Sequence, residues 1–137
     1  MTVIMNEAVR ALLDAPVPAV LATVNPDGGP QTSMVWVGRD GDELLISSTA
    51  GLRKVRNLER EPRASLILHD PADPLRYVEF RGRATVTEDT GRALAVALAE
   101  QYEGPGAGRE YLELPPEVLR VAIRIVPTRV LGTLTKA

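Results

Sequence analysis

Hydroxyl and basic side chains come together between Ser47 and Arg63, in the segment SSTAGLRKVRNLEREPR. An apolar strand is expected to end at the three hydroxyl residues 47–49, and a short helix is expected to follow over 52–60. A helix start offers free N–H groups and the positive end of the helix dipole. Arg and Lys add charge and hydrogen-bond donors. The segment therefore predicts a site for an anionic group, most often phosphate.

The rest of the chain offers no other obvious chemistry. It has no catalytic triad, no metal-ligand spacing and no motif with paired carboxylates. It contains no cysteine, which excludes thiolate catalysis and zinc–sulfur sites. The single histidine, His69, is expected to be structural rather than catalytic. A phosphate site without a nucleophile indicates a phosphorylated cofactor that supplies the reactivity itself, so no catalytic residue and no metal site is predicted.

Composition bounds the class of protein. The 137 residues predict a single domain, 1–137, large enough to bury one core. The net charge is −2, and no aromatic platform accompanies the arginines, so nucleic acid is not an expected partner. No run approaches the ~18 apolar residues of a membrane span, and the first residues do not resemble a signal peptide. The expected location is therefore the cytoplasm, with no membrane partner.

Apolar periodicity and turn residues predict the elements. Helices are expected over 6–14, 52–60 and 89–103; strands over 17–24, 31–37, 43–48, 63–69, 77–87, 118–126 and 129–134, the last two divided at Pro127. Hairpin turns are expected at 25–29 and 39–42, and polar loops at 70–76 and 104–116. Six or seven strands in hairpin order favour a small antiparallel barrel or sandwich.

Periodicity also assigns faces within these elements. Along 77–87, the alternation places Val78, Phe80, Gly82, Ala84 and Val86 inward.

On the helix at 52–60, Arg53, Arg56, Asn57 and Arg60 are expected on one stripe, with Leu52, Val55 and Leu58 toward the core. Two alternatives stay open: Ser48 and Thr49 could cap this helix or contact a ligand. Arg60 and Arg63 are expected in structural ion pairs.

The order of these features resembles the pyridoxamine-phosphate-oxidase-like flavin-binding split barrels, and more narrowly their branch of deazaflavin (coenzyme F420)-dependent reductases. The resemblance covers about residues 6–133. Four segments carry it: VLATVNPDGGPQTSMVWV (20–37), RKVRNLEREPRASLIL (53–68), YVEFRGRATV (77–86) and IRIVPTRVLG (123–132). It implies a mainly β fold, a six-stranded antiparallel split β-barrel with one longer helix inserted late, and a homodimer with cofactor sites at the interface.

The resemblance also implies roles for individual residues. Lys54, Arg56 and Arg53 would hold the cofactor phosphate, while Asn57, Ser48 and Thr49 would help to position that end. Gln31, Thr32 and Ser33 would line the ring, and Tyr77 from the second chain would approach its face. The chain has no Arg/Lys-rich C-terminal segment like that of true pyridoxamine phosphate oxidases, so that activity is not expected.

The implied activity is that of an enzyme, an oxidoreductase that transfers hydride from reduced F420 to a small unsaturated or quinone-like substrate. Two alternatives stay open: an FMN-dependent oxidoreductase of the same fold, and a non-enzymatic carrier of flavin or deazaflavin. The loops at 70–76 and 104–116 are the expected substrate-facing segments.

Overall fold

Seven antiparallel strands form one sheet in the computed structural model, which describes residues 3–136. The sheet order is β2-β1-β5-β6-β7-β4-β3. The strands are β1 (Ala19–Val24), β2 (Pro30–Val35), β3 (Gly38–Asp40), β4 (Glu43–Thr49), β5 (Arg63–Asp70), β6 (Asp73–Glu88) and β7 (Arg120–Leu131). The predicted mainly β antiparallel class is confirmed. The strand count exceeds six because the short β3 occupies part of the turn expected at 39–42.

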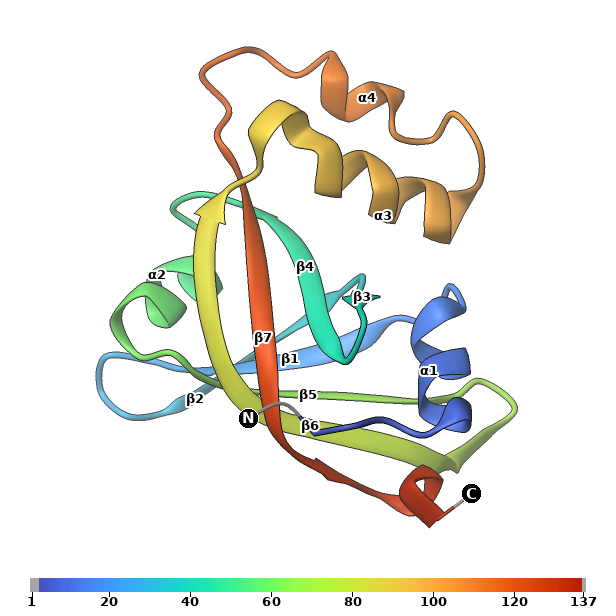
Figure 1. The fold of residues 1–137 in the computed structure, drawn as a ribbon. Coiled ribbons are helices and arrows are strands. Elements are labelled where there is room, and N and C mark those ends of the chain that lie inside the picture. Colours follow the sequence, from blue (N-terminus) through green and yellow to red (C-terminus); the bar gives the residue numbers. More distant parts are fainter. Residues whose placement is uncertain (1–2, 137) are drawn as a thin grey trace.

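The two edge strands of this sheet, β2 and β3, are consecutive in the chain. Only Trp36 and Val37 separate them, so Val35 and Gly38 lie at most about 11 Å apart. The sheet must therefore curl until its edges approach each other, although β2 and β3 share no ladder of hydrogen bonds. Figure 1 shows β1, β2 and β5 lying across β4 and the upper part of β7, which is the arrangement of a split barrel.

β6 and β7 bend where the sheet turns from one half into the other (Figure 1). Arg81 pairs with Arg129 and Gly82 with Pro127, so Thr128 is an extra residue in β7. Such a bulge bends the strand and tolerates a proline, which lacks an N–H. The predicted division of the last strand at Pro127 is therefore wrong, because β7 is continuous through it.

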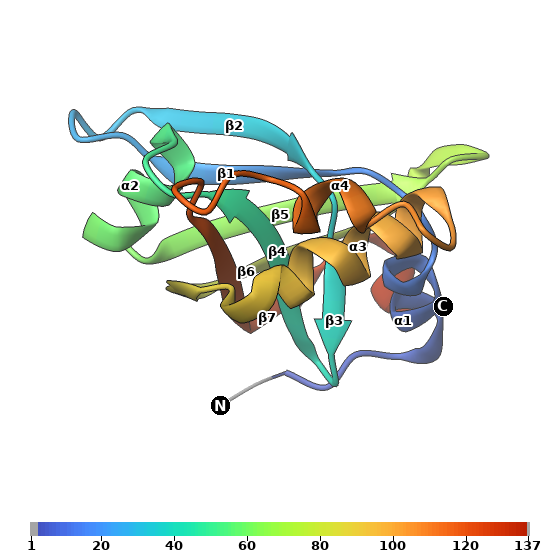
Figure 2. The same cartoon turned by 90° about the horizontal axis from the view of Figure 1, so that it is seen from above.

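Helices cover the ends and one side of the barrel. They are α1 (Glu7–Asp14), α2 (Arg53–Arg60), α3 (Ala93–Glu103) and α4 (Arg109–Leu112), with 3-10 turns at Thr90–Arg92 and Thr133–Lys136. Asn6 caps α1, because its side-chain oxygen accepts a hydrogen bond from the N–H of Val9. Viewed from above, α3 and α4 lie side by side over one end of the barrel (Figure 2). Among residues 3–136, no helix is long and apolar enough to cross a membrane.

Four further elements differ from the sequence predictions. The helix expected over 89–103 is divided at Gly91 and Arg92, whose φ angles are 66° and 57°. β6 begins at Asp73, inside the loop expected at 70–76, and α4 forms inside the loop expected at 104–116. The strand expected at 129–134 ends at Leu131 and is followed by a 3-10 turn.

The core confirms the predicted alternation of β6. Val78, Phe80 and Ala84 are buried, and so are alternate residues of β4, Leu44 and Ile46. Burying these side chains supplies the main driving force for folding. α2 contributes Val55 and Leu58 to this core, as predicted, while Leu52 is exposed instead. The core thus fixes α2 against β1 and β6 and sets the direction of its basic side chains.

Candidate functional site

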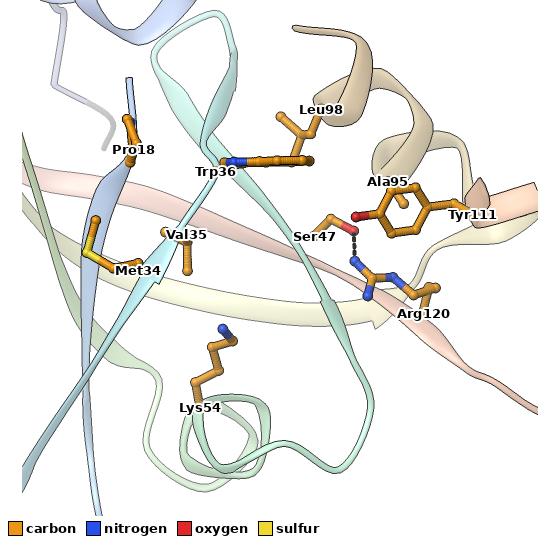
Figure 3. Close-up of a pocket in the computed structure, with 10 residues that line it drawn as sticks. All are labelled: Pro18, Met34, Val35, Trp36, Ser47, Lys54, Ala95, Leu98, Tyr111 and Arg120. Carbon is orange, nitrogen blue, oxygen red and sulfur yellow. Dashed lines mark hydrogen bonds between the residues drawn. The ribbon is translucent and has the colours of Figure 1, made fainter. Parts of the chain in front are cut away.

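A cavity of about 470 Å³ opens between β2, β4, the first turn of α2 and the helices α3 and α4. Its volume lies in the range of small-molecule and cofactor pockets. Ten residues line it: Pro18, Met34, Val35, Trp36, Ser47, Lys54, Ala95, Leu98, Tyr111 and Arg120. Figure 3 shows Lys54 entering from α2, with Arg120 and Ser47 on another side and Trp36 and Leu98 across the top. Two cations and no carboxylate are found among these ten residues, which favours an anionic ligand.

Lys54 is the predicted phosphate ligand that the fold places in this cavity. Its Nζ lies 3.5 Å from the Oγ of Ser33 on β2. Burial lowers the pKa of Lys54 below its ordinary value of 10.5, and the charge of Arg120 lowers it further. Both effects disfavour the ammonium, and an anion in the cavity would reverse them. Lys54 is therefore placed and poised to bind a negative group.

Arg120 is the second cation, and hydroxyl groups hold it rather than carboxylates. Its two Nη atoms donate to Thr49 Oγ1 and Ser47 Oγ, each at 2.8 Å. The guanidinium carbon lies 5.0 Å from the centre of the Tyr111 ring, a cation–π contact. Burial is the largest cause that lowers the pKa of Arg120. Its Nε is buried and, within the described chain, has no hydrogen-bond partner.

The first turn of α2 is left open toward ligands. Leu52 is its N-cap, and no side chain between residues 3 and 136 caps the helix. The alternative that Ser48 or Thr49 caps this helix is therefore wrong. Thr49 accepts from Arg120 instead. Uncapped N–H groups beside Lys54 can receive the oxygens of a phosphate.

Ser48 and Asn57, two predicted site residues, are buried beneath this surface. Ser48 is 3% exposed, and its neighbours Ser47 and Thr49 point to the cavity side of β4. Asn57 is 0% exposed and donates to Thr23 Oγ1 and Asn25 Oδ1, each at 3.0 Å. Asn57 lies beside Arg60 on the predicted stripe, since Arg60 Nη1 donates to its Oδ1 at 3.4 Å, but Asn57 is buried whereas the arginines are exposed. Within a single chain, the hydrogen bonds that Asn57 donates attach α2 to β1 and the turn that follows it.

The three predicted ring-lining residues of β2 divide between its two faces. Ser33 faces Lys54, while Thr32 is exposed. Gln31 accepts a hydrogen bond from Thr23 Oγ1 at 2.6 Å, and Thr23 also accepts from Asn57. Gln31 is therefore linked through Thr23 to Asn57 of α2, which fixes the position of α2 relative to β2.

Arg53, Arg56 and Tyr77 lie outside the cavity of a single chain. Arg53 and Arg56 are exposed on α2, and Tyr77 lies on β6 opposite His69. Arg63 forms the predicted ion pair, with Glu61, at 2.9 Å. Arg60 instead donates to the backbone carbonyl of Val24.

The sequence reasoning missed Ser47, Tyr111 and Arg120 as cavity residues. The indole of Trp36 stacks on the ring of Tyr102, with the ring centres 5.1 Å apart, and lines the cavity as well. The missed residues come from three distant segments. Only the position of Ser47 at a strand end before a basic helix gave a signal.

Arg92 holds the segment that brings Tyr111 over Arg120. Its guanidinium donates to the carbonyls of four residues: Tyr111, Leu114, Pro115 and Val118, at 2.7 to 3.0 Å. Its left-handed backbone conformation is unusual for a residue with a side chain. Arg92 thereby ties 111–118 to the start of α3 and shapes one wall of the cavity.

Replacing Lys54 with methionine should stabilise the protein without ligand at pH 7. The pKa of Lys54 is lowered in the folded state, so the buried ammonium opposes folding at pH values below that folded pKa. The opposition fades as pH rises from the folded pKa toward 10.5, where both states lose the proton. Urea unfolding from pH 7 to 10.5 should show a higher free energy of unfolding for the variant than for the wild-type protein. The gap between the two values should narrow as pH rises. A gap independent of pH would contradict the assignment, and Arg129→Met, on an exposed arginine, is the control.

Comparison with known proteins places the chain in a family. The sequence model described as pyridoxamine 5'-phosphate oxidase matches residues 5–133. A pyridoxine/pyridoxamine 5'-phosphate oxidase of Rubrobacter xylanophilus is 33% identical over 119 residues, covering 79% of this chain and 54% of that protein. Its counterpart from Bradyrhizobium diazoefficiens is 35% identical over 86 residues, covering 62% of this chain and 40% of that protein. The chain thus spans about half the length, or less, of these two relatives.

A solved structure of an F420 reductase is similar over nearly its whole length. It has a TM-score of 0.78 and 34% identity, covering 90% of this chain and 96% of that one. The strand order and the match over residues 5–133 agree with the resemblance seen in the sequence. The protein belongs to the pyridoxamine 5'-phosphate oxidase family.

Proposed function

We propose that the protein is an oxidoreductase that binds coenzyme F420 in this cavity and reduces a small unsaturated or quinone-like compound. The observation that carries the proposal is Lys54, partly buried at the uncapped start of α2 and facing a cavity with mainly apolar walls. A phosphorylated ring cofactor needs both features, a cation with free N–H groups for the phosphate and apolar walls for the ring. The 34% identity to an F420 reductase supports the choice of the deazaflavin.

The residues present fit such a group. Burial and Arg120 both lower the pKa of Lys54, and the buried Nε of Arg120 lacks a partner within residues 3–136, so negative charge in the cavity would stabilise both side chains. Lys54 would bind the phosphate, with Arg53 and Arg56 adding charge at the surface of α2. Asn57, Ser48 and Thr49 would support that end from beneath or beside it.

The chain's own residues would orient the reactants and exclude water. Met34, Val35, Trp36 and Leu98 form apolar walls, and Gln31, Thr32 and Ser33 lie along the strand that would border the ring. The reduced deazaflavin, when bound, supplies a hydride. A quinone that accepts this hydride and one proton from solvent becomes a hydroquinone. Positioning in a dry cavity is the chain's contribution to rate.

Parallel titration of the purified protein with F420 and FMN, followed by cofactor fluorescence, tests the proposal. Tighter binding of F420 supports it and justifies a screen of quinones and enones with reduced F420. Preference for FMN would favour the alternative FMN-dependent oxidoreductase of the same family. Stable binding of F420 without turnover of any acceptor would favour a carrier, and binding of neither cofactor would refute all three.

We also propose that the working form is a homodimer. Several large apolar side chains are exposed in one chain, including Met34 (64%) on β2 and Ile67 (40%) on β5, the two strands that flank β1. Tyr77 lies outside the cavity of its own chain, so its predicted contact with the ring requires a second copy. Light scattering at micromolar concentration should give a mass about twice 14.8 kDa. A monomer would contradict the dimer and the role of Tyr77 together.

A further inference from the structure

The charge of Arg120 has no carboxylate partner in the cavity. The other arginines with resolved ion pairs, such as Arg39 with Asp14 and Arg124 with Glu43, meet acidic side chains at 2.8 Å. Arg120 instead meets the hydroxyls of Ser47 and Thr49, and none of the cavity-lining residues is acidic. Asp89 acts on Arg120 through its charge, but the acceptors that Arg120 hydrogen-bonds within residues 3–136 are both neutral hydroxyls, so the guanidinium remains able to bind an anion on its cavity side.

Three groups hold this guanidinium in one place. Ser47 and Thr49 are on the same face of β4, and each accepts from a different Nη. The ring of Tyr111 covers the guanidinium from α4. Arg92 Nη1 in turn donates to the carbonyl oxygen of Tyr111 at 3.0 Å and holds Tyr111 in place. The side chain is thus ordered before any ligand arrives, so a ligand would not have to immobilise it.

Donors remain free on the immobilised group. A guanidinium has five N–H donors, and two of them are used by Ser47 and Thr49. Its Nε is buried and has no partner in the described residues. A buried donor without a partner is costly. A carboxylate or a similar oxygen anion in the cavity can accept from the unused N–H groups of the two Nη atoms, while the buried Nε stays out of its reach.

Arg120 lies across the cavity from the expected phosphate site. Lys54 and the open first turn of α2 form one side, whereas Arg120 enters from β7 beside α4 (Figure 3). The apolar side chains of Val35, Trp36 and Leu98 lie above both cations in this view (Figure 3). A phosphate held by Lys54 and the N–H groups of α2 would act on Arg120 through its charge but leave the unused Nη donors of Arg120 for a second anion.

We propose that Arg120 binds an acidic group of the substrate, so that the protein selects acceptors bearing a carboxylate or an ionised hydroxyl over their neutral counterparts. This inference rests on the proposed function, because that function makes the ligand of Arg120 a compound that can be reduced. It makes Arg120 a residue that determines specificity, and Ser47, Thr49 and Tyr111 positioning residues that hold it.

Two matched quinones test this inference through the chain's single tryptophan. Trp36 lines the cavity, so its fluorescence reports occupancy without any cofactor. The probes are 2-hydroxy-1,4-naphthoquinone, which is ionised at pH 7, and the neutral 2-methoxy-1,4-naphthoquinone. The wild-type protein should bind the ionised probe roughly tenfold or more tightly than the neutral one, as expected for a charge-assisted hydrogen bond. Arg120→Met should abolish this preference. Arg120→Lys keeps the positive charge but lacks the forked N–H donors of the guanidinium, so it should retain part of the preference.

Arg124→Met is the matched control for the loss of an arginine. Arg124 lies on the same strand, but its partners are Asp40 and Glu43 and it does not line the cavity. This variant should keep the preference for the ionised probe. Thermal unfolding of each variant identifies a loss that comes from misfolding, and Arg120→Lys then decides the inference if Arg120→Met does not fold.

Two outcomes would overturn the inference. One is equal affinity of the wild-type protein for the two quinones. The other is an Arg120→Met variant that keeps the preference while its affinity for F420 or FMN falls, since Arg120 would then serve the cofactor. Failure of the proposed function is distinguishable, because the quinone titration uses the protein without cofactor. A preference for the ionised quinone in a protein that binds neither F420 nor FMN would refute the proposed function and leave the anion-binding role of Arg120 standing.

Discussion

Lys54→Met should weaken binding of the phosphorylated cofactor by roughly ten- to hundredfold, the value of a charge-assisted hydrogen bond in a partly buried site. The cavity already disfavours the charge of Lys54, as its lowered pKa shows, so a bound phosphate would recover much of that unfavourable energy. The loss of affinity should be confined to ligands that carry the phosphate. Titration with FMN and riboflavin, which differ only by that group, should therefore show a large loss for FMN and little for riboflavin.

Arg129→Met is the control for this prediction. Arg129 is exposed on β7 and does not line the cavity. Its loss should change affinity for either ligand by less than about twofold, as for a distant surface charge. Equal losses from the two variants, or an equal loss of FMN and riboflavin in Lys54→Met, would mean that Lys54 does not bind the phosphate.

Gly82→Ala should destabilise the fold by about 3 kcal/mol, the upper range for overpacking a well-packed site. A Cβ at this position would lie 2.2 Å from the carbonyl oxygen of Val126 and 2.9 Å from Cα of Pro127. Both are backbone atoms of β7 at the bend, so neither can rotate away as a side chain could. Urea unfolding monitored by circular dichroism measures the loss as a lower midpoint.

Gly41→Ala separates this steric effect from the general cost of replacing glycine. Gly41 lies in the turn between β3 and β4 with φ 62°, and a Cβ there meets no atom within 4 Å. Only the left-handed backbone would oppose alanine, at roughly 1 kcal/mol. If Gly82→Ala cost no more than Gly41→Ala, the close packing of β6 against β7 would be wrong.

The sequence predicted the sheet well because its strands carry strong local signals. Val78, Phe80 and Ala84 alternate with charged residues, and that period assigns one face to the core. Pro127 misled the prediction because a proline usually ends a strand. Its tolerance depends on the bulge at Thr128 and on Gly82, which lies 45 positions before Pro127 in the chain and opposite it in the ladder.

The candidate site was predictable only where its residues are close in sequence. Lys54 follows a strand end and starts a helix, which is a local pattern. Asn57 lies three residues on, and helical periodicity alone could not show that Thr23 and Asn25 would satisfy it in the core. Arg120 gave no local signal, because its hydroxyl partners are 71 and 73 residues away.

Side chains of α3 attach the connection between β2 and β3 to the segment that precedes β1. The hydroxyl of Tyr102 accepts from the N–H of Val37 at 3.0 Å and donates to the carbonyl of Val17 at 2.7 Å. Gln101 donates to the carbonyls of Leu13 and Val37. Because a helix, not a neighbouring strand, protects the Val37 amide, that amide should exchange with solvent deuterium whenever α3 lifts from the sheet, without the barrel unfolding. Hydrogen exchange at Val37 would then record how often the wall carrying Ala95 and Leu98 opens, and a ligand held against Trp36 would slow it.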